Sequence, residues 1–307
     1  MKHFFSYNYP KSKYAFIWVI FYVYVFVQVI SQVISKNPDS DNLPLLLGGL
    51  FLSIGLMLLL SFFYCKYAVN YFAWKETPFE FTGRFGAYIG RVVLGLLLSI
   101  ITLGIYFPWY ARSITSYVLG NSKYKGESFE FLGKGSKLFV FVLLAGALPM
   151  LVLSIAYGAV LTANPAALQA QSWIFLGLVY LCIIPLLYLQ YKWYINFRYK
   201  DYQIVNKSDF WQGCGMILGQ VLLMIITVGI YSPVAVMRIF KMYAETTTME
   251  NATRKFRFGY DLDTSKVFLF FWGQSLLTII TLGIYSPWAF AKVCRYIASK
   301  TYVEEVQ

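Results

Sequence analysis

The chain has 307 residues, of which 59% are hydrophobic and only 13% are charged. Soluble domains carry about 25% charged residues, so this composition excludes an ordinary soluble protein and indicates an integral membrane protein. The net charge of +12 comes from Lys and Arg between the apolar runs, which is typical of cytoplasmic loops that face anionic lipid headgroups. We therefore expect membrane lipids, and no nucleic acid, as partners.

Four apolar runs are long enough to cross a hydrocarbon core, which takes about 20 residues. In chain order they are Tyr14–Ile34, Pro44–Cys65, Leu138–Ala163 and Trp173–Tyr191. Lysines precede the first run, and the first run lacks the cleavage site of a signal peptide, so we expect a retained span with a cytoplasmic N-terminus. The connections at 36–42 and 164–171 are poor in Lys and Arg and are expected outside the cell.

A twelve-residue motif, L-L-x-I-I-T-x-G-I-Y-x-P, occurs three times. Nine of its twelve positions are identical in the copies at Leu97–Pro108, Leu222–Pro233 and Leu276–Pro287. Repetition at this spacing predicts one structural unit used several times. Each copy is an apolar run that ends in a helix breaker, so the sequence predicts either a membrane span or a helix–turn–helix that enters the membrane and returns.

The distribution of charge favours return to the same side. If each copy spans, the 26 Lys and Arg divide equally between the two sides; if each copy re-enters, all but Lys36 lie on one side. Gly104 can adopt positive φ and Pro108 can start a new helix, so the geometry of a turn is available. We expect four spanning helices plus three re-entrant or short helical units, with seven spanning helices as the alternative.

Short alternating aromatic segments precede the apolar units. Phe79–Gly83 and Phe129–Gly133 share F-E-F-x-G, Phe256–Gly259 is a looser copy, and Tyr202–Ile204 is a degenerate one. Period-two aromatics ended by glycine predict short β-strands, which need partners to be stable. We expect them to pair on the cytoplasmic face of an otherwise all-α polytopic membrane protein with internal repeats.

The combined pattern of F-E-F-x-G, T-L-G-I-Y-x-P-W and G-E-x-F-E-F-x-G resembles the YjgN-like family of bacterial inner-membrane proteins, over roughly Trp74 to Tyr302. The resemblance implies a multi-pass inner-membrane protein of unassigned activity, with no catalytic residues to transfer. Two departures are an apparently added hairpin at 1–73 and Val234 in place of the Trp that follows proline elsewhere. The predicted division is a transmembrane hairpin (1–73), a repeat-containing domain (74–302) and a cytoplasmic tail (303–307).

Few residues suggest chemistry. None of the 14 Asp and Glu lies inside an apolar run, which argues against ion-coupled transport. The only histidine is His3, and the four cysteines lie far apart, so we expect no metal, cofactor or enzymatic activity. Arg91, Gln220 and Gln274 are the polar residues within apolar runs. Arg91 is expected to be an interfacial anchor, with a substrate anion site as the alternative. Gln220 and Gln274 are expected to be helix–helix contacts, with the lining of a polar pathway as the alternative.

The motif residues have the same two interpretations, a structural turn or a surface that faces a solute. They are Thr102, Gly104, Tyr106, Pro108, Thr227, Gly229, Tyr231, Pro233, Thr281, Gly283, Tyr285 and Pro287. If three such tips converge, passive or facilitated passage of a small solute or lipid is the preferred function, because irregular backbone at membrane depth must be buried or line a cavity. The alternative is a membrane scaffold that binds lipid or recruits partners.

Overall fold

The structure, a computed structural model, describes residues 2–9, 11–35, 43–163 and 168–306. At its centre is a closed antiparallel barrel of ten strands, in the order β1-β10-β9-β8-β7-β6-β5-β4-β3-β2. The all-α prediction is therefore wrong, and the fold is mixed. The predicted strands at the FxF motifs are present. The sequence did not reveal their partners, because strands such as β4 (Ser122–Tyr124) have only three residues and follow a helix directly.

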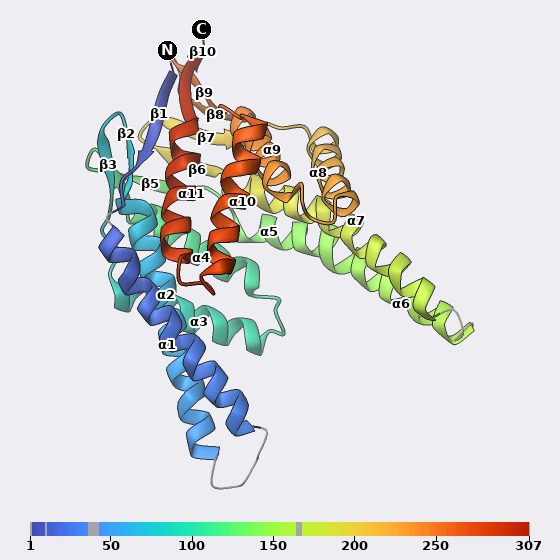
Figure 1. Cartoon of the computed structure of the whole chain (residues 1–307). Coiled ribbons are helices and arrows are strands. Elements are labelled where there is room, and N and C mark those ends of the chain that lie inside the picture. Colours follow the sequence, from blue (N-terminus) through green and yellow to red (C-terminus); the bar gives the residue numbers. More distant parts are fainter. Residues whose placement is uncertain (1, 10, 36–42, 164–167, 307) are drawn as a thin grey trace.

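The chain consists of five consecutive strand–helix–helix–strand units (Figure 1). The first comprises β1 (Lys2–Tyr7), α1 (Lys11–Ser35), α2 (Leu43–Asn70) and β2 (Phe72–Trp74). The second comprises β3 (Thr77–Phe81), α3 (Phe85–Ile101), α4 (Phe107–Gly120) and β4. The third comprises β5 (Glu127–Phe131), α5 (Gly135–Val142), the π-helical turn Leu143–Ala147, α6 (Leu148–Ala163), α7 (Leu168–Tyr194) and β6 (Asn196–Tyr199).

The fourth unit comprises β7 (Tyr202–Asn206), α8 (Phe210–Ile226), α9 (Ser232–Glu245) and β8 (Thr247–Glu250). The fifth comprises β9 (Lys255–Tyr260), α10 (Thr264–Ile280), α11 (Ser286–Lys300) and β10 (Thr301–Val306). The sequence repeats marked units two, four and five, whereas the structure shows that units one and three have the same order of elements with longer helices.

The barrel closes where the two ends of the chain meet. Strand β1 pairs with β10, with Lys2 opposite Glu304 and Phe4 opposite Tyr302. The amine of Lys2 also lies 3.1 Å from the carboxylate of Asp261, just after β9, and their hydrogen bond raises the pKa of Lys2. The barrel thus takes strands from all three segments of the predicted division, and the boundaries at 73/74 and 302/303 cut through it.

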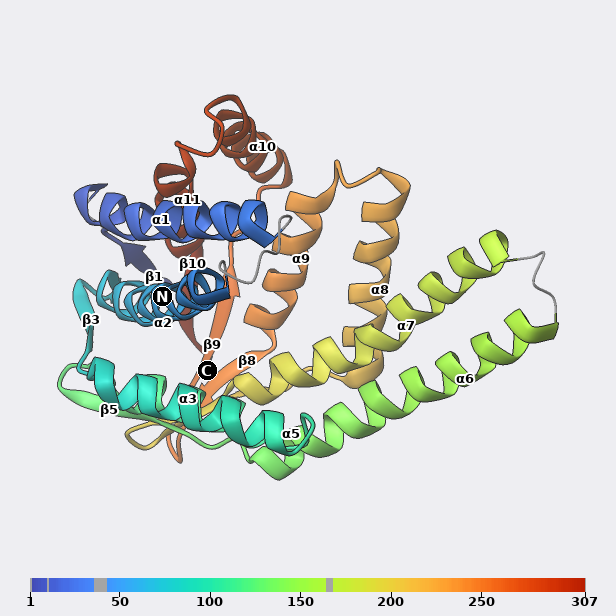
Figure 2. The same ribbon diagram turned by 90° about the horizontal axis from the view of Figure 1, so that it is seen from below.

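All five helical hairpins leave the same end of the barrel, because each joins two neighbouring antiparallel strands (Figure 1). Successive hairpins contact each other in a ring: α2 packs against α3, α4 against α5, α7 against α8, α9 against α10 and α11 against α1. Figure 2 shows the ring from below, with α6 and α7 extending side by side beyond the shorter hairpins. The opposite end of the barrel carries the tight strand–strand turns and both termini.

Three helices within the described part of the chain are long and apolar enough to cross a membrane: Pro44–Asn70, Gly135–Thr162 and Ile174–Tyr194. These correspond to three of the four predicted spans. The described apolar part of α1, Trp18–Val33, is shorter. The predicted external connection at 36–42 and the start of the one at 164–171 lie outside the described residues.

The aromatic strand motifs share one register that the sequence only partly indicated. In the second to fifth units, the first strand ends three residues before the residue that immediately precedes the helix. The last residues of these strands are Phe81, Phe131, Asn206 and Tyr260, and the residues that precede the helices are Arg84, Lys134, Asp209 and Asp263. The true counterpart of Phe79–Phe81 in the fifth unit is therefore Phe258–Tyr260, two residues beyond the looser copy read from sequence. The carboxylates of Asp209 and Asp263 accept backbone N–H groups and cap their helices.

The glycine of F-E-F-x-G gives space to the ring two residues before it. A Cβ at Gly83 would overlap the ring of Phe81 and approach the hydroxyl of Tyr117, and a Cβ at Gly133 would overlap Phe131 in the same way. The Tyr117 hydroxyl donates to the carbonyl of Arg84 at 2.7 Å, which ties the returning helix to the start of the first. The motif therefore fixes the junction between strand and hairpin.

We expect Gly83→Ala to destabilise the protein by about 1–3 kcal/mol, because the added methyl overpacks the Phe81 ring. Gly86→Ala is the matched control, since a Cβ at this helical glycine meets nothing within 4 Å and alanine is the better helix former by about 1 kcal/mol. Thermal unfolding of the full chain in detergent compares the two variants. Equal melting temperatures would contradict the packing role of Gly83.

Candidate functional site

Each repeated motif forms the tip of a short helical hairpin. At the first tip, the N–H of Gly104 donates to the carbonyl of Ser99 at 2.7 Å and the N–H of Leu103 to that of Ile100 at 3.1 Å. This pair of bonds is a Schellman motif, which satisfies the last carbonyls of a helix. The other two tips have the same bonds at the same positions. The chain therefore reverses at all three motifs.

Two consecutive residues at each tip have positive φ. Gly104, Gly229 and Gly283 have φ values of 88°, 83° and 90°, and the residues before them, Leu103, Val228 and Leu282, have values of 51°, 50° and 49°. Sequence reasoning identified the glycines but missed the preceding residue, where a left-handed conformation is uncommon and is strained for valine. An aliphatic side chain is present at a position that glycine would occupy at lower cost.

The motif threonine closes the turn from both sides. The hydroxyl of Thr102 donates to the carbonyl of Leu98 at 2.7 Å and accepts the N–H of Tyr106 at 3.0 Å. Thr227 and Thr281 make the same two bonds. The prolines stand within the first turn of the second helix, where their missing N–H is not needed. The threonine hydroxyls of the motif are thus used within the turn itself.

The three tips expose aliphatic side chains almost completely. Leu103, Val228 and Leu282 are 93%, 89% and 90% exposed. Side chains so exposed do not pack against one another, so the tips do not converge, and the expectation of a shared site at their meeting point is wrong. The physical reason is topological: the motifs occupy the second, fourth and fifth places in a ring of five hairpins.

Seven residues before the motif threonine, the second unit has a glycine and the fourth and fifth units have a glutamine. An exchange of side-chain volume between the two helices of the hairpin explains this difference. In the second unit, a Cβ at Gly95 would overlap the ring of Tyr110 on the opposing helix. The fourth unit has Gln220 with Ala235, and both are buried, at 6% and 0% exposed. A large residue on either helix is matched by a small one on the other. Gln220 is therefore part of the packing between the two helices.

The polar residues near the tips form local contacts. Tyr285 donates its hydroxyl to Oε1 of Gln274 at 2.9 Å and accepts from the amine of Lys292 at 2.7 Å. In the fourth unit the guanidinium of Arg238 lies over the ring of Tyr231, 5.8 Å from its centre. The Oε1 atom of Gln220 is buried without a partner. These groups belong to separate hairpins, and the structure does not join them into one path.

Arg91 is exposed on α3. Its guanidinium donates to the carbonyl of Ala87 at 3.2 Å and lies 4.6 Å from the centre of the Tyr117 ring.

Tyr106 stacks on Trp109, with ring centres 6.2 Å apart, and Tyr285 stacks on Trp288 at 6.4 Å. In the fourth unit Val234 replaces this tryptophan and is buried at 1% exposed.

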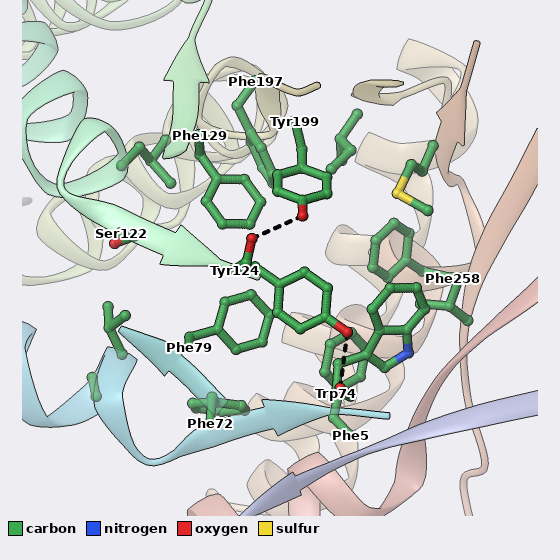
Figure 3. A pocket seen from close by; sticks show the side chains of 16 residues that line it. Phe5, Phe72, Trp74, Phe79, Ser122, Tyr124, Phe129, Phe197, Tyr199 and Phe258 are labelled. Atoms are coloured by element: carbon green, nitrogen blue, oxygen red, sulfur yellow. Dashed lines mark hydrogen bonds between the residues drawn. The ribbon is translucent and has the colours of Figure 1, made fainter. Parts of the chain in front are cut away.

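The lumen of the barrel is a second candidate site, which the sequence did not indicate. A cavity of about 360 Å³ lies inside it, and every strand contributes at least one lining side chain (Figure 3). Most are aromatic, among them Phe5, Trp74, Phe79, Phe129 and Phe258. The first phenylalanine of the FxF motif thus points into the lumen, and the second packs under the helices. The period-two pattern carried this signal, but closure into a barrel was needed to interpret it.

Two tyrosine hydroxyls bridge the lining strands. Tyr124 donates to the carbonyl of Trp74 at 3.0 Å, and Tyr199 donates to the carbonyl of Tyr124 at 2.8 Å (Figure 3). Burial raises the pKa of both tyrosines, so both hydroxyls stay protonated and keep these bonds over the whole neutral range. The indole Nε1 of Trp74, in contrast, is buried and has no partner.

The lumen is an apolar pocket of about 360 Å³. Ligand pockets commonly range from about 300 to 1,000 Å³. The lumen therefore has the size and the lining of a binding site for an apolar molecule.

The volume exchange predicts a rescue. Gly95→Gln alone should destabilise the protein by more than about 1 kcal/mol, because its side chain overlaps Tyr110. Adding Tyr110→Ala reproduces the pairing of the fourth unit and should recover much of the loss, with a coupling energy of about 0.5–3 kcal/mol. Unfolding of both single variants and the double variant measures this coupling. Additive losses would show that the two positions are independent.

The tips predict opposite effects at adjacent positions. Gly104→Val should cost roughly 1–3 kcal/mol through backbone strain alone, because a Cβ there meets nothing within 4 Å. Leu103→Gly should leave the melting temperature unchanged or raise it, because glycine adopts positive φ freely. Gly90→Val, in the middle of α3 with equally open surroundings, is the control. A loss at Gly90 as large as that at Gly104 would remove the strain argument.

Parts of the chain are similar to known proteins. Residues 76–200, which include the whole of the second and third units, match the family model described as bacterial protein of unknown function (DUF898). A segment of 75 residues is 35% identical to inner membrane protein YjgN of Salmonella typhimurium, covering 24% of this chain and 19% of that protein. A segment of 62 residues is 37% identical to inner membrane protein YjgN of Escherichia coli, covering 20% and 16%. No solved structure matches the chain.

The matched segments span less than a fifth of either relative, so the similarity to YjgN is distant and partial. The match over 76–200 nevertheless falls on the repeated motifs that carried the family resemblance in the sequence. With three candidate membrane spans in its described part, this chain is a membrane protein in which residues 76–200 match the DUF898 family model.

Proposed function

We propose that the protein is a non-enzymatic membrane scaffold that binds lipid at the cytoplasmic face of the bacterial inner membrane. The observation that carries this proposal is the near-complete exposure of Leu103, Val228 and Leu282 at three equivalent tips. Exposed aliphatic side chains at the ends of apolar helices are favourable only if hydrocarbon surrounds them. The three short hairpins then act as wedges in the inner leaflet.

Helix lengths support this placement. Helix α3 has 17 residues, about 25 Å at ~1.5 Å per residue, which is shorter than a hydrocarbon core of ~30 Å. Helix α2 has 28 residues, about 42 Å, and can cross. Because both ends of every hairpin join the same end of the barrel, the long hairpins cross twice and the short ones enter and return. The barrel and both termini then lie on one side.

Charge supports the cytoplasmic assignment of that side. The sequence count places all Lys and Arg except Lys36 on the barrel side under this arrangement, as the positive-inside rule requires. Arg84 and Lys134 stand directly before α3 and α5, at the junction of barrel and helices, where anionic headgroups would meet them. The inner-membrane location of the YjgN relatives supports the choice of membrane.

Passage of a solute through converging tips was the preferred hypothesis from sequence, and the separated tips remove its main argument. The hydroxyls and amides of the motif serve the turn and the helix contacts. The scaffold hypothesis needs only the apolar tips, the basic junction and a rigid barrel. The scaffold hypothesis is also compatible with a protein partner that binds the exposed barrel turns.

Single cysteines in a background without the four native cysteines test the placement. Cysteines at the exposed barrel turns, Lys125 and Asp201, should react with an impermeant thiol reagent only from the cytoplasmic side. Cysteines at Leu103 and Leu282 should react slowly from both sides, because hydrocarbon shields them. Fast labelling of either tip from outside the cell would show that the short hairpins span, and would overturn the wedge arrangement.

A further inference from the structure

The barrel lumen is a built site without an assigned occupant. Its wall is apolar and aromatic on all sides, and contributions come from all ten strands (Figure 3). Water gains little in such a space, because an apolar cavity offers it too few hydrogen-bond partners and stays dry. A hydrocarbon occupant would recover the contacts that an empty lumen lacks.

One buried polar group, the indole Nε1 of Trp74, lies in the otherwise apolar wall of the lumen. Among the described side chains that line it, the hydroxyls of Ser122, Tyr124 and Tyr199 donate to backbone carbonyls, whereas Nε1 of Trp74 has no acceptor. A buried N–H without a partner is costly and rare. The occupant that best fits is therefore apolar along most of its length, and an oxygen that it carries accepts from this indole when the ring turns to expose the otherwise buried N–H.

The two ends of the lumen differ, and this gives the occupant a direction. The last turns of α2 and α4 contribute Ala68, Val69 and Leu119 to the lining, and α2 is a candidate membrane span. At the other end, Trp74 is the last residue of β2 before the turn, and the amine of Lys75 lies 4.9 Å from the centre of its ring. The hydrocarbon of the membrane can thus reach one end of the lumen, whereas the indole of Trp74 and the amine of Lys75 lie at the other end.

We propose that the lumen binds a single long-chain acyl group from the membrane. Its tail lies toward the ends of α2 and α4, and its carboxyl or ester oxygen accepts from Nε1 of Trp74 near Lys75. The acyl group could come from a free fatty acid or from a phospholipid, since both carry the same chain and the same oxygen. The site is independent of the hairpin tips and does not require that they insert.

Photocrosslinking in vesicles of phosphatidylethanolamine and phosphatidylglycerol tests the proposal with the full chain. One arm contains palmitate with a diazirine in its chain, and the other contains phosphatidylethanolamine with the same diazirine chain. Peptide mass spectrometry then locates the adducts. We expect adducts on lumen residues such as Phe79, Met249 and Val303 in at least one arm, and the arm that labels them identifies the source of the chain. In both arms, adducts on exposed helix residues such as Leu151 show that the helices are inserted in the bilayer that contains the probe.

Two variants and a control make the result specific. Ala68→Phe places a ring in the lumen and should lower lumen adducts at least tenfold, whereas Ala159→Phe, the same substitution on the exposed surface of α6, should leave them unchanged. Trp74→Phe keeps an aromatic ring but removes the donor, so lumen adducts should fall several-fold. Helix adducts, which do not depend on the lumen, should stay constant in all three.

The proposal is overturned if helix residues are labelled in both arms while lumen residues are labelled in neither. It is also overturned if lumen labelling survives Ala68→Phe in a protein that unfolds at the wild-type temperature. Should that variant fail to fold, Ile204→Trp fills the lumen from the opposite wall and carries the same expectation. A tip cysteine that reacts from outside the cell would refute the wedges but leave this result unaffected.

Discussion

The hydrogen bonds that close the barrel are the constraint on which the rest of the structure depends. Its strands have three to six residues, and an isolated hairpin of two such strands is at best marginally stable. Closure between β1 and β10 gives every strand two neighbours and leaves no free edge. Because a hairpin of helices connects the two strands of each unit, the same closure arranges the five hairpins as a ring.

Closure also decides how the chain meets the membrane. Each unit begins and ends in adjacent antiparallel strands of the same barrel, so each hairpin must bring the chain back to the end from which it left. A single crossing per motif, as in the alternative of seven spans, is incompatible with this connectivity. In the arrangement that we propose, hairpin length then determines how deep each unit reaches, which separates the two long hairpins from the three short ones.

The repeats diverge where packing allows exchange. Gly95 with Tyr110, and Gln220 with Ala235, fill the same space between paired helices with opposite assignments of large and small side chains. By contrast, the turn residues are nearly invariant among the three tips, since the Schellman bonds and the threonine bridge need a fixed backbone. The strained residue before each glycine is aliphatic in all three tips although its side chain makes no bond in the turn, which is consistent with a role of that side chain at the surface of the tip.

The sequence by itself determined the features that are local. Apolar length predicted the long spans, nine shared positions predicted a common turn, and alternating phenylalanines predicted strands. These follow from interactions within a few residues, such as the bond from Thr102 to Leu98. The motifs also indicated a resemblance to YjgN-like proteins, and segments of the chain are 35% and 37% identical to two proteins of that name.

The tertiary structure alone decided the barrel, its five-membered ring and its lumen. Strands such as β4 and β2 are too short to show a period, and their pairing joins residues that lie far apart in the chain, as for β1 and β10. A lumen exists only after all ten strands have closed, so no single segment could carry its signal.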